Sequence, residues 1–142
     1  MTAEKYLEQI KSIDAIIVNK LKDHRRFVEL ATGIGGFSVG ERVKATPNLQ
    51  RGADAIGAYI DLERDIAELT RKREAIIKDI EKLPPIEYRI IYYLYVDYTE
   101  DGDEYTFKEL AYKFKKSYDF VKKHKRRGLA ILQSILDERA ES

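Results

Sequence analysis

The sequence predicts an all-α protein: a long N-terminal antiparallel helical hairpin of coiled-coil type, followed by three shorter helices. Apolar residues recur at spacings of three and four along most of the 142-residue chain, which is the period of an amphipathic helix. Only three prolines occur, and two of them, Pro84 and Pro85, are adjacent. Because proline ends one helix and suits the first turn of the next, we expect one domain over residues 1–83 and a second over 84–142.

The first helix is expected from Thr2 to Leu30. Lys20 and His24 interrupt its apolar stripe, which consists of Tyr6, Ile10, Ile13, Ile17, Phe27 and Ala31. After this helix the periodicity is lost, and four glycines between residues 33 and 40 predict a long loop over 32–48.

The second helix, expected from Leu49 to Lys82, has the most regular apolar stripe, broken only at Arg73. A helix of that length spans roughly 50 Å at 1.5 Å per residue, and its stripe needs a partner helix. The first helix is the nearest candidate, which gives the hairpin. Self-association of the stripe into a dimeric coiled coil is the alternative. The stripe consists of Tyr59, Leu62, Ile66, Leu69, Ile76, Ile80 and Leu83.

A third helix is expected from Pro85 to Tyr98, before an acidic loop over residues 99–104. Its expected inner face consists of Ile86, Ile90, Ile91 and Leu94. Thr106 and Glu109 have the spacing of a capping box, which predicts a short helix ending at Phe114.

The last helix is expected to begin at Ser117, a good N-cap residue, after a turn at Lys115 and Lys116. It should continue to Leu136, with an inner face of Val121, Leu129, Leu132 and Leu136. Two helices joined by a short turn, with the second capped and basic, are the signature of a helix-turn-helix motif.

The charge distribution points to a polyanion as the partner of this motif. Residues 107–127 contain nine Lys and Arg against two acidic residues, a net charge of +7, whereas the whole chain has a formal charge of +1. Basic residues gathered in this way bind phosphates and release the counterions condensed on nucleic acid. The motif is therefore expected to bind double-stranded DNA.

Residues 83–132 resemble the region-4 helix-turn-helix of sigma-70-type factors. The shared landmarks are Leu83-Pro84, Arg89, Leu110-Ala111, Ser117, Val121 and Arg127-Gly128-Leu129. The whole chain is also similar to the ArpU/RinA-like transcriptional regulators of phages and prophages of Gram-positive bacteria. This second resemblance rests on Thr2-Ala3, Tyr6-Leu7, Gln9-Ile10, Gly40-Glu41-Arg42-Val43, Tyr59-Ile60-Asp61-Leu62-Glu63 and Ser117-Tyr118.

The resemblance implies a regulator of phage late genes that acts on promoter DNA in the cytoplasm of a bacterial host. The N-terminal hairpin would form a homodimer or contact another protein, such as the host RNA polymerase. By position the resemblance assigns DNA binding to Lys116, Ser117, Tyr118, Asp119, Lys122, Lys123, Lys125, Arg126 and Arg127. Tyr118, Asp119, Lys122 and Lys123 would face the major groove, where Lys donates to guanine and Asp accepts from cytosine. Lys116, Lys125 and Arg126 would hold phosphates, and Arg127 would be partly structural.

The composition argues against other classes of protein. The chain has no cysteine and only two, widely separated histidines, so we expect no metal site, no cofactor and no enzymatic activity. No apolar run approaches 18 residues, and the N-terminus lacks a signal sequence, so we expect no membrane association. Two alternatives stay open. One is a DNA-packaging adaptor of the small-terminase kind, whose hairpin would drive ring assembly. The other is a motif that contacts only protein.

Overall fold

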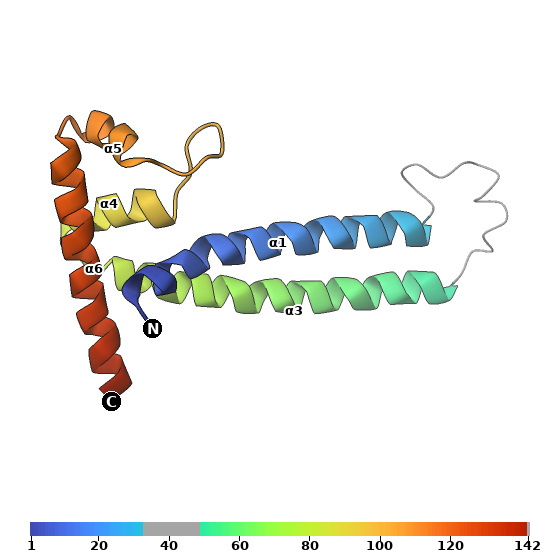
Figure 1. Ribbon diagram of the computed structural model, residues 1–142. Helices are drawn as coiled ribbons and strands as arrows, with labels where there is room; N and C mark the ends of the chain where they lie inside the picture. The colour runs from blue at the N-terminus through green and yellow to red at the C-terminus, as the bar shows by residue number, and fades with distance from the viewer. Residues whose placement is uncertain (33–48, 142) are drawn as a thin grey trace. The chain divides into compact units, whose positions relative to one another are not determined.

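The computed structural model describes residues 1–32 and 49–141, and every regular element within these ranges is a helix (Figure 1). The helices are α1 (Ala3–Thr32), α3 (Leu49–Ile80), α4 (Pro85–Tyr95), α5 (Phe107–Phe114) and α6 (Tyr118–Glu141). The prediction of an all-α fold is confirmed for these ranges. None of these helices is both long enough and apolar enough to span a membrane. The loop predicted over residues 32–48 falls, from residue 33 onward, outside the described residues.

Two helix ends differ from the prediction by more than two residues. Helix α4 ends at Tyr95 and not at Tyr98, because the N–H groups of Val96 and Asp97 both turn back to the carbonyl of Tyr92. Helix α6 continues past Leu136 to Glu141. Hydrogen bonds to other parts of the chain, described below, hold this last stretch.

The chain divides into two compact units, and both long helices contribute to each. Unit 1 consists of residues 1–13 and 72–142, and unit 2 consists of residues 14–71. The sequence-based boundary at Pro84 therefore falls inside unit 1. The physical reason is that the first turns of α1 and the last turns of α3 share a hydrophobic core with α4 and α6.

The core of unit 1 is built from aliphatic side chains with almost no exposed surface. Its fully buried members are Leu7, Ile10, Ile80, Ile91 and Leu132, which come from α1, α3, α4 and α6. Burying one such side chain contributes roughly 1.5–3 kcal/mol to folding. Helical spacing predicted Ile10, Ile80, Ile91 and Leu132 as inner-face residues, whereas Leu7 was not singled out.

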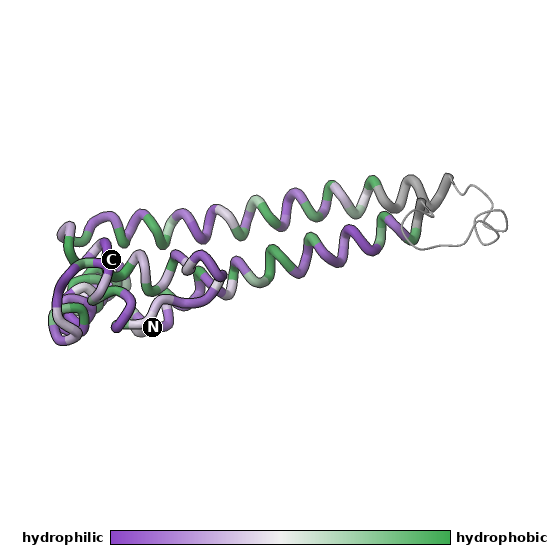
Figure 2. Tube along the Cα trace, turned by 90° about the horizontal axis from the view of Figure 1, so that it is seen from above, coloured by the Kyte–Doolittle hydropathy of each residue, from purple (hydrophilic) through white to green (hydrophobic). Residues whose placement is uncertain are grey.

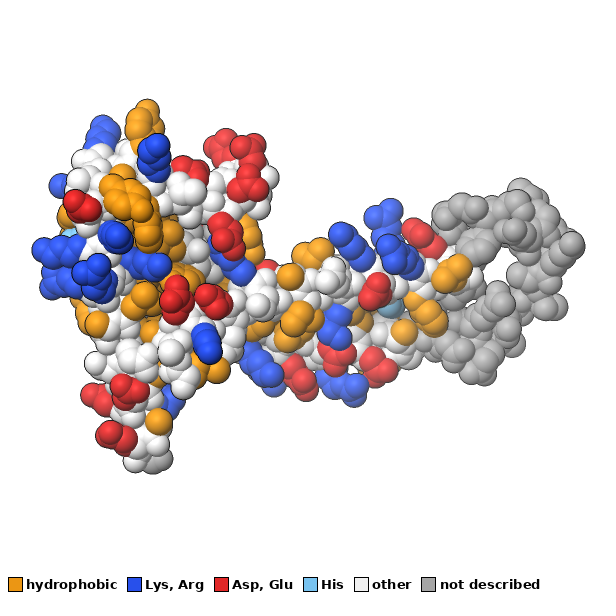
Figure 3. All heavy atoms as spheres, viewed as in Figure 1, with side chains coloured by type: hydrophobic (Ala, Val, Ile, Leu, Met, Phe, Trp, Pro, Cys, Tyr) orange, Lys and Arg blue, Asp and Glu red, His pale blue; other side chains and the backbone are white. Residues whose placement is uncertain are grey.

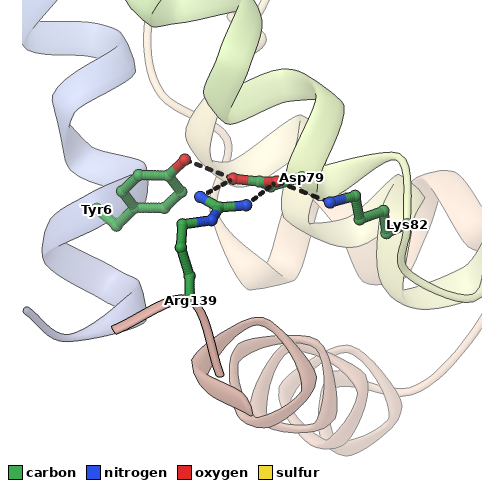
Figure 4. A network of polar contacts seen from close by, with 4 residues as sticks. All are labelled: Tyr6, Asp79, Lys82 and Arg139. Atoms are coloured by element: carbon green, nitrogen blue, oxygen red, sulfur yellow. Dashed lines mark hydrogen bonds and ion pairs between the residues drawn. The ribbon is translucent and has the colours of Figure 1, made fainter. Parts of the chain in front are cut away.

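A buried carboxylate ties three helices of unit 1 together (Figure 4). Arg139 of α6 donates two hydrogen bonds to Asp79 of α3, at 3.0 and 2.8 Å. The Tyr6 hydroxyl of α1 donates another at 2.5 Å, and Lys82 donates a fourth at 3.3 Å. Burial acts to raise the pKa of Asp79, but the hydrogen bonds from Arg139, Tyr6 and Lys82 outweigh it and hold the pKa at about 2. The network explains why α6 continues beyond Leu136.

Unit 2 is an antiparallel pair formed by α1 and α3, with apolar and polar positions alternating along both helices (Figure 2). The Lys20 ammonium lies 3.3 Å from the Asp65 carboxylate, and the rings of His24 and Tyr59 are 5.6 Å apart. Lys20 and His24, which interrupt the predicted stripe, thus face α3. Phe27, a predicted member of that stripe, is 38% exposed. No side chain within residues 14–30 and 56–71 is fully withdrawn from solvent.

Candidate nucleic-acid interface

Helix α5 begins with the predicted capping box. The Thr106 hydroxyl accepts a hydrogen bond from the Glu109 N–H at 3.2 Å, and the Glu109 carboxylate accepts one from the Thr106 N–H at 3.2 Å. Two N–H groups that lack partners within the helix are satisfied in this way. The cap therefore fixes where this eight-residue helix starts.

The turn between α5 and α6 depends on one residue in the left-handed region. Lys115 has φ 56° and ψ 43°, and the N–H of Lys116 closes the turn on the carbonyl of Ala111 at 2.9 Å. Ser117 then caps α6 as predicted, because its hydroxyl accepts a hydrogen bond from the Phe120 N–H at 3.0 Å. Two consecutive helices are thereby joined by three residues.

A second hydrophobic cluster holds α4, α5 and α6 against one another. One residue of each helix is almost fully buried at its centre, namely Ile90, Leu110 and Val121. Aromatic side chains surround them, and the Tyr93 ring meets those of Tyr105 and Phe114 edge-on at 5.2 and 5.7 Å. This cluster determines which side of α6 is left outside.

The first half of α6 has a buried side and a basic exposed side. Val121, His124, Gly128 and Leu132 are buried, at spacings of three and four. The opposite side of the helix lies about 180° away at 100° per residue. The exposed residues there are Asp119, Lys122, Lys123 and Arg126. We call these four residues the outer face of α6. Tyr118, at the start of the helix, is 48% exposed and meets the Phe107 ring edge-on.

Lys125 does not belong to the outer face. Its side chain is only 24% exposed, and its ammonium lies 3.9 Å from the Glu4 carboxylate of α1. The same ammonium lies over the rings of Phe107 and Tyr95, at 5.1 and 5.8 Å from their centroids. Of the cations assigned to DNA, Lys125 is thus the one held against the interior of unit 1.

Arg127 also has a partner within the protein. Its Nε lies 3.8 Å from a carboxylate oxygen of Glu87, and the same oxygen is 2.8 Å from Nδ1 of His124. Glu87 is buried in α4. Burial acts to raise its pKa, but His124 and Arg127 outweigh that effect and lower it. The two contacts fix the rotation of α6 relative to α4.

Sequence reasoning missed this buried pair, although a signal was present. Glu87 precedes Ile90 and Ile91 by three and four residues, which is the spacing of an inward position on a helix. We expected Ile86 on the inner face of α4. That expectation is wrong, since Ile86 is 46% exposed and Glu87 takes the inward position.

Gly128 is the second missed feature. A Cβ atom there would lie 2.9 Å from Cγ1 of Ile91 and 3.4 Å from the Cβ of Glu87. These distances leave no room for a side chain at position 128, so glycine lets α4 and α6 approach closely there. The His124–Glu87 contact lies on the same side of α6, one helical turn before Gly128.

Charge along the exposed side of α6 is graded. Basic side chains gather over its first half, and acidic side chains stand at its C-terminal end (Figure 3). The exposed acidic residues there are Asp137, Glu138 and Glu141. Phosphates would therefore be attracted to the N-terminal half of α6 and repelled from its end.

Comparison with known proteins found no family model, no curated protein and no solved structure that matches this chain.

Proposed function

We propose that the protein is a sequence-specific DNA-binding regulator of transcription, of phage or prophage type, and that α5, the Lys115–Ser117 turn and α6 form its helix-turn-helix. The observation that carries the proposal is the outer face of α6. Three exposed cations, Lys122, Lys123 and Arg126, stand on one side of a capped helix whose other side is buried. Such a helix presents its N-terminal half to the major groove in helix-turn-helix complexes.

Within this proposal the candidate DNA-contacting residues divide by position. Asp119, Lys122 and Lys123 are the candidates for contacts with base edges, since they lie nearest the capped end of the outer face. Arg126 is the candidate for a phosphate contact farther along the helix. Tyr118, Ser117 and Lys116 flank this region at the turn. Lys125 and Arg127 have carboxylate neighbours within the protein, so we assign them mainly to positioning the helix.

The resemblance to sigma region 4 and to ArpU/RinA-like regulators supports a role at promoters in the bacterial cytoplasm. It suggests activation of late phage genes, with host RNA polymerase as a protein partner. A single helix-turn-helix reads only a short stretch of bases, so a homodimer that places two such helices on DNA would account for specificity.

The decisive experiment compares DNA fragments from the promoter region of the protein's own operon with random duplex of equal length, at one fixed salt concentration. A regulator should bind at least one fragment about 10³-fold more tightly than random duplex. Asp119→Ala and Lys122→Ala should change the preferred base at defined positions. If every promoter fragment binds no more tightly than random duplex, the protein is not a sequence-specific regulator.

The second candidate is an assembly protein that packages DNA. The observation favouring it is the set of apolar side chains that unit 2 leaves exposed, including Leu21, Ile56 and Ile60 at 50%, 65% and 58%. Association of such surfaces builds dimers or larger rings. The mass of the full chain in solution separates the two, because a dimer fits a regulator and a ring fits a packaging adaptor.

A further inference from the structure

Unit 1 has a small hollow at the corner where the start of α4, the end of α5 and the start of α6 meet. Its volume is about 130 Å³, and it is lined by Ile86, Arg89, Ile90, Phe114, Lys116 and Phe120. Four of these side chains are apolar. One of the four, Ile86, is 46% exposed and so is open to contact from outside.

The two cations of the hollow rest on its aromatic walls. The Arg89 guanidinium lies 4.8 Å from the centroid of the Phe114 ring, and the Lys116 ammonium lies 5.5 Å from that of Phe120. Within residues 1–32 and 49–141, neither cation forms an ion pair with a carboxylate. The hollow thus combines an apolar floor with a positive rim whose charge is not neutralised there.

The size of the hollow selects the kind of occupant. Sites for small organic ligands measure roughly 300–1,000 Å³, so this hollow is too small to enclose one. A dry cavity of about 150 Å³ holds a single benzene molecule, which is the size of one phenylalanine ring. One large apolar side chain from another molecule therefore fits.

The position of the hollow argues against DNA as that molecule. Phe120 follows Asp119 by one residue, so it lies about 100° around α6 from it, on the flank of the outer face. A sugar-phosphate backbone carries no apolar side group to fill the floor. A protein segment with an apolar side chain next to carboxylates matches both the floor and the rim.

We propose that this hollow is a docking site for a partner protein, which inserts one Phe or Leu side chain and pairs an adjacent Asp or Glu with Arg89 or Lys116. The proposal does not depend on the function proposed above, because none of its steps involves DNA. In this proposal the exposed Ile86 contacts the apolar side chain of the partner.

The test uses the full chain with ¹³C-labelled isoleucine methyl groups and a synthetic peptide, acetyl-Glu-Asp-Phe-Glu-Asp-amide. We expect saturable shifts of the Ile86 and Ile90 methyl signals, with a dissociation constant on the order of 1 mM for such a small contact. Replacing the peptide's Phe by Ser should weaken binding at least about tenfold. Replacing its acids by amides should weaken binding about threefold, since the ion pairs are exposed.

Matched variants separate this hollow from other apolar surfaces. Ile86→Ser should abolish the peptide-induced shifts, whereas Ile60→Ser, at a similarly exposed isoleucine of unit 2, should leave them unchanged. The Arg89→Glu variant should bind a peptide with Lys in place of the acidic residues more tightly than it binds the acidic peptide. Thermal unfolding of each variant checks that it is folded.

Three results would overturn the proposal. One is the absence of saturable shifts up to about 10 mM peptide, tenfold above the expected dissociation constant. Another is binding that does not depend on the peptide's Phe. The last is a loss of affinity for duplex DNA in Ile86→Ser as large as that in Lys123→Ala, which would assign the hollow to a DNA interface.

Discussion

Units 1 and 2 are both made of amphipathic helices, yet they differ in how completely they bury their apolar stripes. In unit 1 four helices enclose the stripes, and Ile80 and Leu132 have no exposed surface. Among the described residues of unit 2 only α1 and α3 pair, and Leu62 of the apolar stripe stays partly exposed. Two helices can cover only one side of each other, whereas a third and fourth helix cover the flanks. Unit 1 is thus suited to hold side chains rigidly, and unit 2 to present apolar surface to another molecule.

The same substitution in the two cores should reveal the largest difference between the units. Leu132→Ala in unit 1 should lower the free energy of unfolding by about 2–5 kcal/mol, because it leaves a cavity in a closed core. Leu62→Ala in unit 2 should lower it by about 1 kcal/mol, since water already reaches the site. Urea denaturation of both variants measures the difference. Equal losses would mean that unit 2 is buried in solution, as it would be in an oligomer.

The Asp79 network should make unit 1 sensitive to acid. The pKa of Asp79 is about 2 in the folded protein and about 4 in an unfolded chain. Its contribution is therefore present above about pH 4 and is lost as the pH falls towards 2, which amounts to about 2 kcal/mol. We expect Asp79→Asn to be less stable than the natural chain at pH 6 and to differ from it little at pH 2.

A carboxylate of unit 2 provides the control for this measurement. Asp61 pairs with Arg64 at 3.1 Å, but both side chains are about two-thirds exposed, at 64% and 65%. Asp61→Asn should therefore leave the acid dependence of unfolding nearly unchanged. If both variants follow the same pH profile, the network does not stabilise unit 1 in the way described.

DNA affinity should distinguish cations of unit 1 from those of unit 2. Arg126→Ala should weaken binding to all duplexes several-fold and reduce the slope of log affinity against log salt by about one. Arg26→Ala, at an exposed residue of α1 in unit 2, should change neither quantity. Lys125→Ala should leave the salt slope unchanged, because its ammonium is held near Glu4. A slope reduced equally in all three variants would contradict the proposed outer face.

The smallest expected effects concern two residues of unit 1 that have a positive φ. Lys115 has φ 56° and Gly102 has φ 85°. The left-handed backbone conformation costs a residue with a side chain about 1 kcal/mol of conformational free energy, whereas glycine adopts it without this cost. Lys115→Gly should therefore stabilise the protein by up to about 1 kcal/mol, and Gly102→Ala should destabilise it by a similar amount. Thermal unfolding should show shifts of opposite sign, and shifts of the same sign would refute this account of the turns.

Local signals predicted most of the helices and their caps. The capping box at Thr106 and the N-cap at Ser117 depend on residues three apart in the chain, so they can be recognised without the tertiary structure. The inward position of Val121 follows from helical periodicity in the same way. Helix ends were predicted less well where distant contacts decide them, as for the final turn of α6, which Asp79 holds through Arg139.

Contacts between distant segments could not be predicted from spacing. The pairing of Glu87 with His124 joins residues 37 apart, and that of Lys125 with Glu4 joins α6 to the start of α1. Both contacts depend on how α6 is rotated against α4 and α1. If α6 were rotated about its axis by one residue, about 100°, a different set of its cations would face outward. For this reason the sequence shows that Lys125 is close to Lys122 and Lys123 along the chain, but it does not show that Lys125 lies on a different side of α6.

The amino-acid sequence by itself determined that this chain is helical, where α5 and α6 begin, and that its basic residues gather around the turn between them. These properties arise from periodicity, capping and composition, which act over a few residues. Only the tertiary structure decided which cations of α6 face outward and that Ile86 is exposed beside a small apolar hollow. It also decided that the first turns of α1 and the last turns of α3 belong to the same core as α4 and α6. Those outcomes depend on side-chain packing between segments, where Gly128 and Glu87 determine how α6 lies on α4.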